Sequence, residues 1–303
     1  DIVMPKKLLT IVAFLTVLFI GDRFGAFVLG TILKYSKLPV VQMYAGRSES
    51  DVVLLGNSRA FRHFDVDFLV QEFGGPVENL SYPGVSMLIS LALLRDFIDI
   101  YGAPELVVLE LSGLTSKQSS AAVFRPLTPR SDRLTAILKS NFPRQYYATK
   151  ISHLYNYNNN FFLNASHKVF FPVRDPVLQG AMSEVAANDP KSRREENYFI
   201  TRPGNMEALK AIIDLTQKQE IELRLVISPS LLAFARQNGY HGWRQEILTA
   251  TKGIRIWDYG IRPPLELKYF RNGAHLNVRG VDHFMDLLRR EGFFKKQYRR
   301  SLT

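Results

Sequence analysis

A serine and a histidine, far apart in the sequence, are the two side chains best placed to do chemistry together. Ser58 directly follows the apolar run at residues 51–55, and His275 lies in the loop before the last predicted helix. A serine at the carboxyl end of a strand presents its hydroxyl to the crevice where ligands of α/β sheets bind. A histidine in that crevice can take the hydroxyl proton and return it to a leaving group. Considered separately, Ser58 could be only a helix N-cap and His275 only a capping or surface residue.

Five short apolar runs supply the frame that must position these residues. They are rich in valine, isoleucine and leucine, as is typical of buried parallel strands, and they occupy residues 51–55, 77–80, 105–111, 221–227 and 254–257. Apolar residues at helical spacing follow at residues 87–101, 204–220, 231–236, 243–251 and 278–290. The alternation predicts a three-layer α/β domain with a five-stranded parallel sheet.

Residues 115–201 do not follow this alternation of strands and helices. The stretch contains an asparagine-rich run, several prolines and a charged segment, and it separates the third predicted strand from the helix at 204–220. We therefore expect an insertion at about 115–201 within a domain of residues 39–303. Long connections of this kind are often functional, so we expect the insertion to cap or flank the site.

The N-terminal region is predicted to be a membrane anchor over residues 1–38. Two lysines precede a long apolar stretch, and residues 8–33 as one helix would extend about 39 Å. That length crosses a hydrocarbon layer of about 30 Å with some tilt. Asp22 and Arg23 are costly at mid-bilayer, so we expect them near the outer interface or against another helix. We expect a single pass with the amino terminus inside and the bulk of the chain outside; the alternatives are a signal sequence and a buried core helix.

The composition limits both the chemistry and the partners. The chain has no cysteine, which excludes thiol catalysis and cysteine-ligated zinc, and its six histidines form no metal-binding spacing. We expect neither a metal nor a cofactor. The net charge of +11 suits an anionic polymer or lipid surface. Nucleic acid is not expected as a partner, because the basic residues are dispersed and the domain is predicted outside the cytoplasm.

Three segments together resemble the SGNH, or GDSL-like, hydrolase superfamily. Gly56-Asn57-Ser58 matches the block after the first strand, Gly84 matches the glycine after the second, and Asn272-Gly273-Ala274-His275 matches the block before the last helix. The resemblance spans about residues 51–292. It implies a three-layer, flavodoxin-like fold that works without a cofactor.

The resemblance also implies roles for the matched residues. Ser58 would form an acyl-enzyme, and His275 would act as acid and base. The backbone N–H groups of Ser58 and Gly84 would form the oxyanion hole. The implied activity is that of a serine esterase or acyltransferase.

The N-terminal span narrows the resemblance to one branch. The motifs L-L-G-N-S-R at 54–59 and G-A-H-L-N-V-R-G at 273–280, behind one membrane helix, are similar to those of extracytoplasmic SGNH-like proteins that accompany membrane-bound O-acyltransferases. Proteins of that kind serve teichoic acid alanylation and the O-acetylation of alginate and other exopolysaccharides. The resemblance implies a bacterial inner-membrane protein with a periplasmic domain, a membrane-bound O-acyltransferase as partner and a polysaccharide as substrate.

Two positions depart from the superfamily pattern. Asn272 stands where an aspartate is expected, and a neutral amide in a triad can cost about 10⁴ in rate. Asn272 could still orient His275, or Asp258 or Asp282 could replace it, with Asp258 favoured at the end of the fifth strand. The asparagine expected after the third strand as an oxyanion donor is missing, and Ser112 is the candidate replacement. The alternative function is therefore a catalytically degraded scaffold or glycan-binding subunit of an acylation or export complex.

Arg59 and His63 follow the predicted nucleophile and lie four residues apart. On one helical turn they could bind an anionic sugar or phosphate near Ser58. The alternative is a solvated or ion-paired surface.

Overall fold

The computed structural model describes residues 5–117, 122–171, 180–183 and 198–295. The chain divides into two compact units, one formed by residues 1–47 with 119–173 and the other by residues 48–118 with 174–303. The N-terminal helix and much of the expected insertion therefore belong to the same unit.

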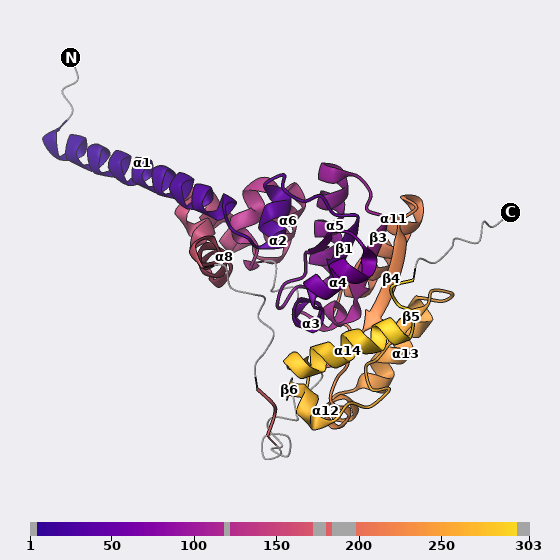
Figure 1. Ribbon diagram of the computed structural model, residues 1–303. Coiled ribbons are helices and arrows are strands. Elements are labelled where there is room, and N and C mark those ends of the chain that lie inside the picture. Colours follow the sequence, from indigo (N-terminus) through magenta and orange to yellow (C-terminus); the bar gives the residue numbers. More distant parts are fainter. Residues whose placement is uncertain (1–4, 118–121, 172–179, 184–197, 296–303) are drawn as a thin grey trace. The chain divides into compact units, whose positions relative to one another are not determined.

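The larger unit is built on a parallel sheet of five strands (Figure 1). The strands are β1 (Val52–Leu55), β2 (Val77–Asn79), β3 (Leu106–Glu110), β4 (Glu222–Ile227) and β5 (Ile256–Asp258), in the order β2-β1-β3-β4-β5. Every neighbouring pair is parallel. The predicted α/β class and five-stranded parallel sheet are confirmed.

Alternate residues of the strands bury against helices on opposite faces of the sheet. On one face, Leu54, Val108 and Val226 belong to an apolar core with Phe284 and Met285. The helices of that core are α3 (Ser58–His63), α4 (Val66–Phe73) and α14 (Val278–Arg290). The other helices of this unit include α5 (Met87–Tyr101) and α11 (Asn205–Lys218), which pack on each other, α12 (Leu232–Gln237) and α13 (Tyr240–Ala250).

The strand order places a switch point at β1 and β3. The chain passes from β1 to its neighbour β2 on one side and then to β3 on the other side. Loops leaving the carboxyl ends of two such strands diverge, and ligands of open α/β sheets bind in the crevice between them. Ser58 begins the helix that follows β1 after Gly56 and Asn57, and Glu110 ends β3, so both belong to this edge of the sheet.

The smaller unit is helical. It comprises α1 (Lys6–Lys34), α2 (Pro39–Tyr44), η3 (Arg125–Arg130), α6 (Asp132–Asn141), α7 (Pro143–Ile151), η4 (Leu154–Tyr157) and α8 (Asn160–Phe170). The second half of α1 packs on η4 and α8, whereas its first half extends beyond them (Figure 1). This part of the chain is thus folded around the helix that was predicted as an anchor.

By length and composition, helix α1 could cross a membrane. A signal sequence can have the same length and composition. Its most apolar window is only 6% buried, which argues against the alternative of a core helix. The structure provides an intrachain partner for the charges within it. The Asp22 carboxylate accepts hydrogen bonds from the backbone N–H of His153 at 2.8 Å and of Leu154 at 3.2 Å, and it pairs with Arg23.

Candidate functional site

The turn from β1 into α3 sets the position of Ser58. Gly56 has a φ of 146°, and a Cβ there would lie 2.7 Å from the Cβ of Ala60, so only glycine fits. Asn57 caps α3, because its Oδ1 accepts the N–H of Arg59 at 2.9 Å. Ser58 is therefore the first helical residue and not the N-cap, which leaves its hydroxyl free for another partner.

That partner is His275. The Ser58 Oγ lies 2.9 Å from Nε2 of His275, which is carried by the hairpin of β6 (Phe270–Asn272) and β7 (His275–Leu276). The other ring nitrogen, Nδ1, lies 3.0 Å from Oδ1 of Asn272. The structure thus brings together the predicted nucleophile, the predicted base and Asn272, one of the three candidate orienting residues.

Asn272 fixes the tautomer of the imidazole. Its Oδ1 accepts the backbone N–H of Ala274 at 3.0 Å and that of His275 at 2.9 Å, which identifies this atom as the oxygen. An oxygen can only accept, so Nδ1 of His275 carries the proton and donates it. Nε2 is then the acceptor for the Ser58 hydroxyl, which is the arrangement that a general base requires.

The electrostatic surroundings weaken His275 as a base. Burial lowers its pKa to about 3, and the positive charges of Arg62 and Arg59 add to the effect. Asn272 is neutral, so it contributes no charge to stabilise an imidazolium. Arg62, on α3, was not predicted as a site residue, and its own pKa is lowered by burial.

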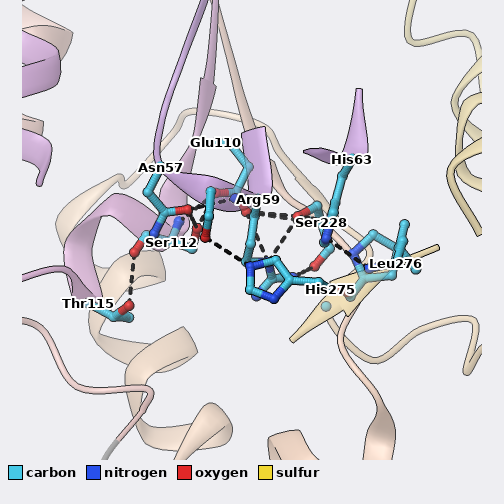
Figure 2. A network of polar contacts seen from close by, with 12 residues as sticks. Asn57, Arg59, His63, Glu110, Ser112, Thr115, Ser228, His275 and Leu276 are labelled. Atoms are coloured by element: carbon cyan, nitrogen blue, oxygen red, sulfur yellow. Dashed lines mark hydrogen bonds and ion pairs between the residues drawn. The ribbon is translucent and has the colours of Figure 1, made fainter. Parts of the chain in front are cut away.

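Figure 2 shows a buried polar network centred on Glu110. The side chains of Glu110 and Arg59 are fully buried, with Nε of Arg59 3.7 Å from Oε1 of Glu110. Oε1 also accepts the hydroxyl of Ser228 at 3.0 Å, and Oε2 accepts the N–H of Ser112 at 3.0 Å. Ser228 follows β4, so the network joins the carboxyl ends of β3 and β4 to α3.

His63 connects this network to the hairpin that carries His275 (Figure 2). Its Nε2 accepts the N–H of Leu276 at 3.1 Å, so its Nδ1 is protonated and donates to Oγ of Ser228 at 2.9 Å. Its ring meets that of His275 edge-on, with the centroids 6.0 Å apart. Burial, followed by the charge of Arg59, lowers the pKa of His63 well below its usual value.

The expectation that Arg59 and His63 contact substrate does not fit this geometry. Both side chains have no exposed surface, and both are bonded to Ser228. The i, i+4 spacing was correct for one face of a helix, but that face points toward the sheet and not toward solvent. We describe them as positioning residues.

The other predicted site residues, among them Asp258 as the favoured replacement for Asn272, form no hydrogen bond or ion pair with His275 in the described part of the chain. Asp258 accepts the hydroxyl of Tyr240 at 2.6 Å and pairs with Arg244. Asp282 is exposed on α14. Gly84 forms an exposed turn after β2 with a φ of 80°.

Ser112 lies inside the buried network and not at its surface. Its hydroxyl is 2.6 Å from Oδ1 of Asn57 and also donates to Glu110. With this hydroxyl already engaged, its role as an oxyanion donor stays a prediction, as does that of Gly84. Within the described residues no cluster of three or more histidine, aspartate or glutamate side chains could hold a metal ion.

Besides Arg62, the sequence reasoning missed Glu110 and Ser228. Both carry a signal that could have found them. Glu110 is a carboxylate at the carboxyl end of an otherwise apolar, central strand, and Ser228 directly follows β4. A charged residue at that position must be paired or exposed, and the switch point is where pairing is useful.

We compared the chain with known protein families, sequences and structures. No protein-family model matches the chain, and no curated protein sequence matches it. Among solved structures, the chain is similar to one described as "a putative platelet activating factor from Streptococcus pneumonia", with 12% sequence identity and a TM-score of 0.40. The match covers 92% of this chain and 98% of that one. A likeness at this level carries no argument about activity.

Proposed function

We propose that this chain is a serine-dependent esterase or acyltransferase of the SGNH type. One observation carries the proposal, namely the hydrogen bond of 2.9 Å between Oγ of Ser58 and Nε2 of His275. The correct tautomer of His275, set by Asn272, supports it. The location of the pair at the switch point of a parallel sheet supports it as well.

The reaction proceeds in two acyl transfers. Oγ of Ser58 attacks the carbonyl carbon of an acyl ester while Nε2 of His275 takes the hydroxyl proton. The tetrahedral intermediate collapses, the ester bond to the leaving alcohol breaks, and His275 returns the proton to that alcohol. An acceptor hydroxyl, from water or a sugar, then attacks the acyl-enzyme by the reverse sequence and frees Ser58.

We infer a membrane-proximal, polymeric substrate for this chemistry. The apolar helix α1 supports an anchor, and the net charge of +11 supports an anionic polymer. The finer proposal is a periplasmic domain on the bacterial inner membrane that transfers acyl groups to, or removes them from, an exported polysaccharide. Its partner would be a membrane-bound O-acyltransferase that supplies the acyl group.

The second candidate is a catalytically degraded subunit that binds glycan or organises an acylation complex. The neutral Asn272 and the lowered pKa of His275 favour it, because both reduce general-base catalysis. In that case Ser58 would have no chemical role, and a Ser58→Ala variant would keep its cellular phenotype.

The test is detection of a covalent acyl adduct on the full chain in mild detergent. After exposure to an activated aryl acetate, we expect the intact mass to rise by one acetyl group in the wild type. Ser58→Ala should show no adduct, whereas Ser140→Ala, which removes an exposed serine hydroxyl on α6, should react like the wild type. An adduct that persists in Ser58→Ala, or a folded wild type without one, would contradict the enzyme proposal and favour the scaffold.

A further inference from the structure

The helical unit contains a cavity of about 420 Å³ that the proposed acyl chemistry does not use. Its walls come from α1, η3, α6, α7 and η4 together with His153. The lining includes Arg23, Phe27, Tyr146, Lys150, Asn156 and Tyr157. This volume suits a small ligand or the headgroup of a larger one.

The charged lining of the cavity is positive. Arg23 and Lys150 both line it, and none of its described lining residues is an aspartate or glutamate. Arg23 is ion-paired with Asp22, whose carboxylate also accepts the backbone N–H groups of residues 153 and 154, so Lys150 supplies the net positive charge of the lining. Lys150 lies 5.1 Å from the ring of Tyr146, at the same wall. The cavity therefore favours a ligand that carries negative charge.

Asn156 indicates a second requirement of the ligand. The residue is 6% exposed, and its Nδ2 donates to the carbonyl of His153 at 3.2 Å. Its Oδ1 has no hydrogen-bond partner among the residues that the structure describes. A buried acceptor left unpaired costs about 1–3 kcal/mol, so a hydroxyl donor from a ligand would relieve that cost. An anion that also bears a hydroxyl meets both requirements.

The surface beside the cavity is apolar. Before it along α1, Leu15 and Phe19 are 57% and 58% exposed, and Phe27, which lines the cavity, is 71% exposed. Ile151, next to Lys150, is 79% exposed. Exposed apolar side chains on both α1 and α7 are where the alkyl chains of a lipid would lie while its headgroup occupies the cavity.

We propose that this cavity binds a hydroxyl-bearing phosphate ester, either as the glycerol headgroup of an anionic phospholipid or as free glycerol phosphate. The phosphate would lie at Arg23 and Lys150, and a hydroxyl would donate to Oδ1 of Asn156. Because no lining residue belongs to the α/β unit, this site stands or falls independently of Ser58 and His275.

The experiment measures lipid retention by the full chain in detergent, using native mass spectrometry. Phosphatidylglycerol and phosphatidylcholine are offered in equal amounts, and we expect phosphatidylglycerol to be retained about tenfold more, as one charge-assisted interaction provides. Lys150→Gln and the nearly isosteric Asn156→Asp should each remove most of that preference. Arg144→Gln is the matched control, because Arg144 is exposed on the same helix as Lys150 and does not line the cavity.

Soluble glycerol 3-phosphate distinguishes the two sources of the ligand. Competition with phosphatidylglycerol supports a headgroup site that also accepts the free ester, and failure to compete while the lipid preference persists supports the lipid alone. Equal retention of the two lipids by the wild type would overturn the proposal. So would an unchanged preference in Lys150→Gln with wild-type near-ultraviolet circular dichroism, or an equal loss in Arg144→Gln.

Discussion

The two histidines next to Ser58 occupy opposite surroundings. His63 is fully buried, and both of its ring nitrogens form hydrogen bonds. It contacts the network that contains the buried carboxylate of Glu110 and the buried guanidinium of Arg59. His275 is partly exposed and is oriented by the amide of Asn272, which is itself exposed. We refer to His63, Arg59 and Glu110 as the buried region and to His275 and Asn272 as the exposed region. The buried region contains an ion pair between Arg59 and Glu110, whereas in the exposed region Asn272 orients the imidazole without contributing a charge. The difference separates what positions the site from what would drive its chemistry.

The largest effect is expected from Glu110→Gln, which breaks the buried region. The substitution leaves the guanidinium of Arg59 enclosed without its counter-charge, and breaking a buried pair in this way costs about 3–5 kcal/mol. We expect the free energy of unfolding of the α/β unit to fall by that amount, measured on the full chain by chemical denaturation in detergent. Glu266→Gln is the control, because the Glu266–Lys268 pair is exposed, and no measurable change is expected. Equal free energies of unfolding for the two variants would show that the buried network does not stabilise the fold.

The second prediction concerns Asn272→Asp, which introduces a carboxylate beside His275 in the exposed region. In Asn272→Asp a carboxylate would face the three N–H groups that now converge on Oδ1, from Ala274, His275 and the ring of His275. It would stabilise the imidazolium, raise the pKa of His275 and increase turnover of an aryl acetate by about 10- to 10²-fold. This gain is smaller than the 10⁴ of a buried triad because the side chain of residue 272 is exposed.

The pH profile gives the sign of that effect. His275 acts as a base only when neutral, so activity is lost as the pH falls through its pKa. With a pKa of about 3, the wild type should show no acid limb between pH 5 and 8. Asn272→Asp should bring the limb to higher pH. A faster variant with an unmoved limb, or a slower variant, would exclude Asn272 as the residue at the triad position.

The contrast also shows what could be predicted from the sequence. The five strands and the helices Met87–Tyr101 and Val278–Arg290 follow from apolar spacing, because burial of one face or of both imposes that spacing. The positions of Ser58 and His275 follow in turn, since the carboxyl edge of a parallel sheet collects the loops of several strands.

Three aspects of the structure could not be predicted in the same way. Spacing placed Arg59 and His63 on one face of a helix, but it does not tell which face meets the sheet. Glu110 was included in an apolar run, and its partners are remote in sequence. Helices η4 and α8 pack on α1, a long-range contact that no local pattern contains.

The third prediction tests the buried histidine through pH-dependent stability. The pKa of His63 is lowered in the folded state, so below about pH 6.5 the unfolded chain binds one more proton at this residue than the folded chain. The contribution of His63 to the free energy of unfolding is therefore fully present above that pH. It decreases by about 1.4 kcal/mol for each pH unit below it. His63→Gln should reduce this slope by that amount, and His241→Gln, which alters an exposed side chain, should leave it unchanged. A wild-type slope in His63→Gln would contradict the assigned tautomer and burial.

The smallest effect is expected where the two regions meet, at Arg62. After burial, the charge of Arg62 is the next largest cause of the lowered pKa of His275, and Nε of Arg62 has no partner among the described residues. Arg62→Gln should therefore raise the pKa of His275 without breaking a hydrogen bond at that atom. We expect aryl acetate turnover to rise about two- to threefold, with Arg279→Gln, exposed at the start of α14, as the control.

Combining Asn272→Asp with Arg62→Gln tests whether both residues affect activity only through the pKa of His275. If Asn272 and Arg62 act only through the pKa of His275, Arg62→Gln should move the acid limb in the same direction in the Asn272→Asp background as in the wild type. A raised KM for an anionic acyl ester in Arg62→Gln, with kcat unchanged, would instead assign the guanidinium to substrate binding, because removing a binding group raises KM whereas removing a repulsive charge raises kcat. The split between KM and kcat therefore distinguishes a residue that restrains the base from one that holds the polymer.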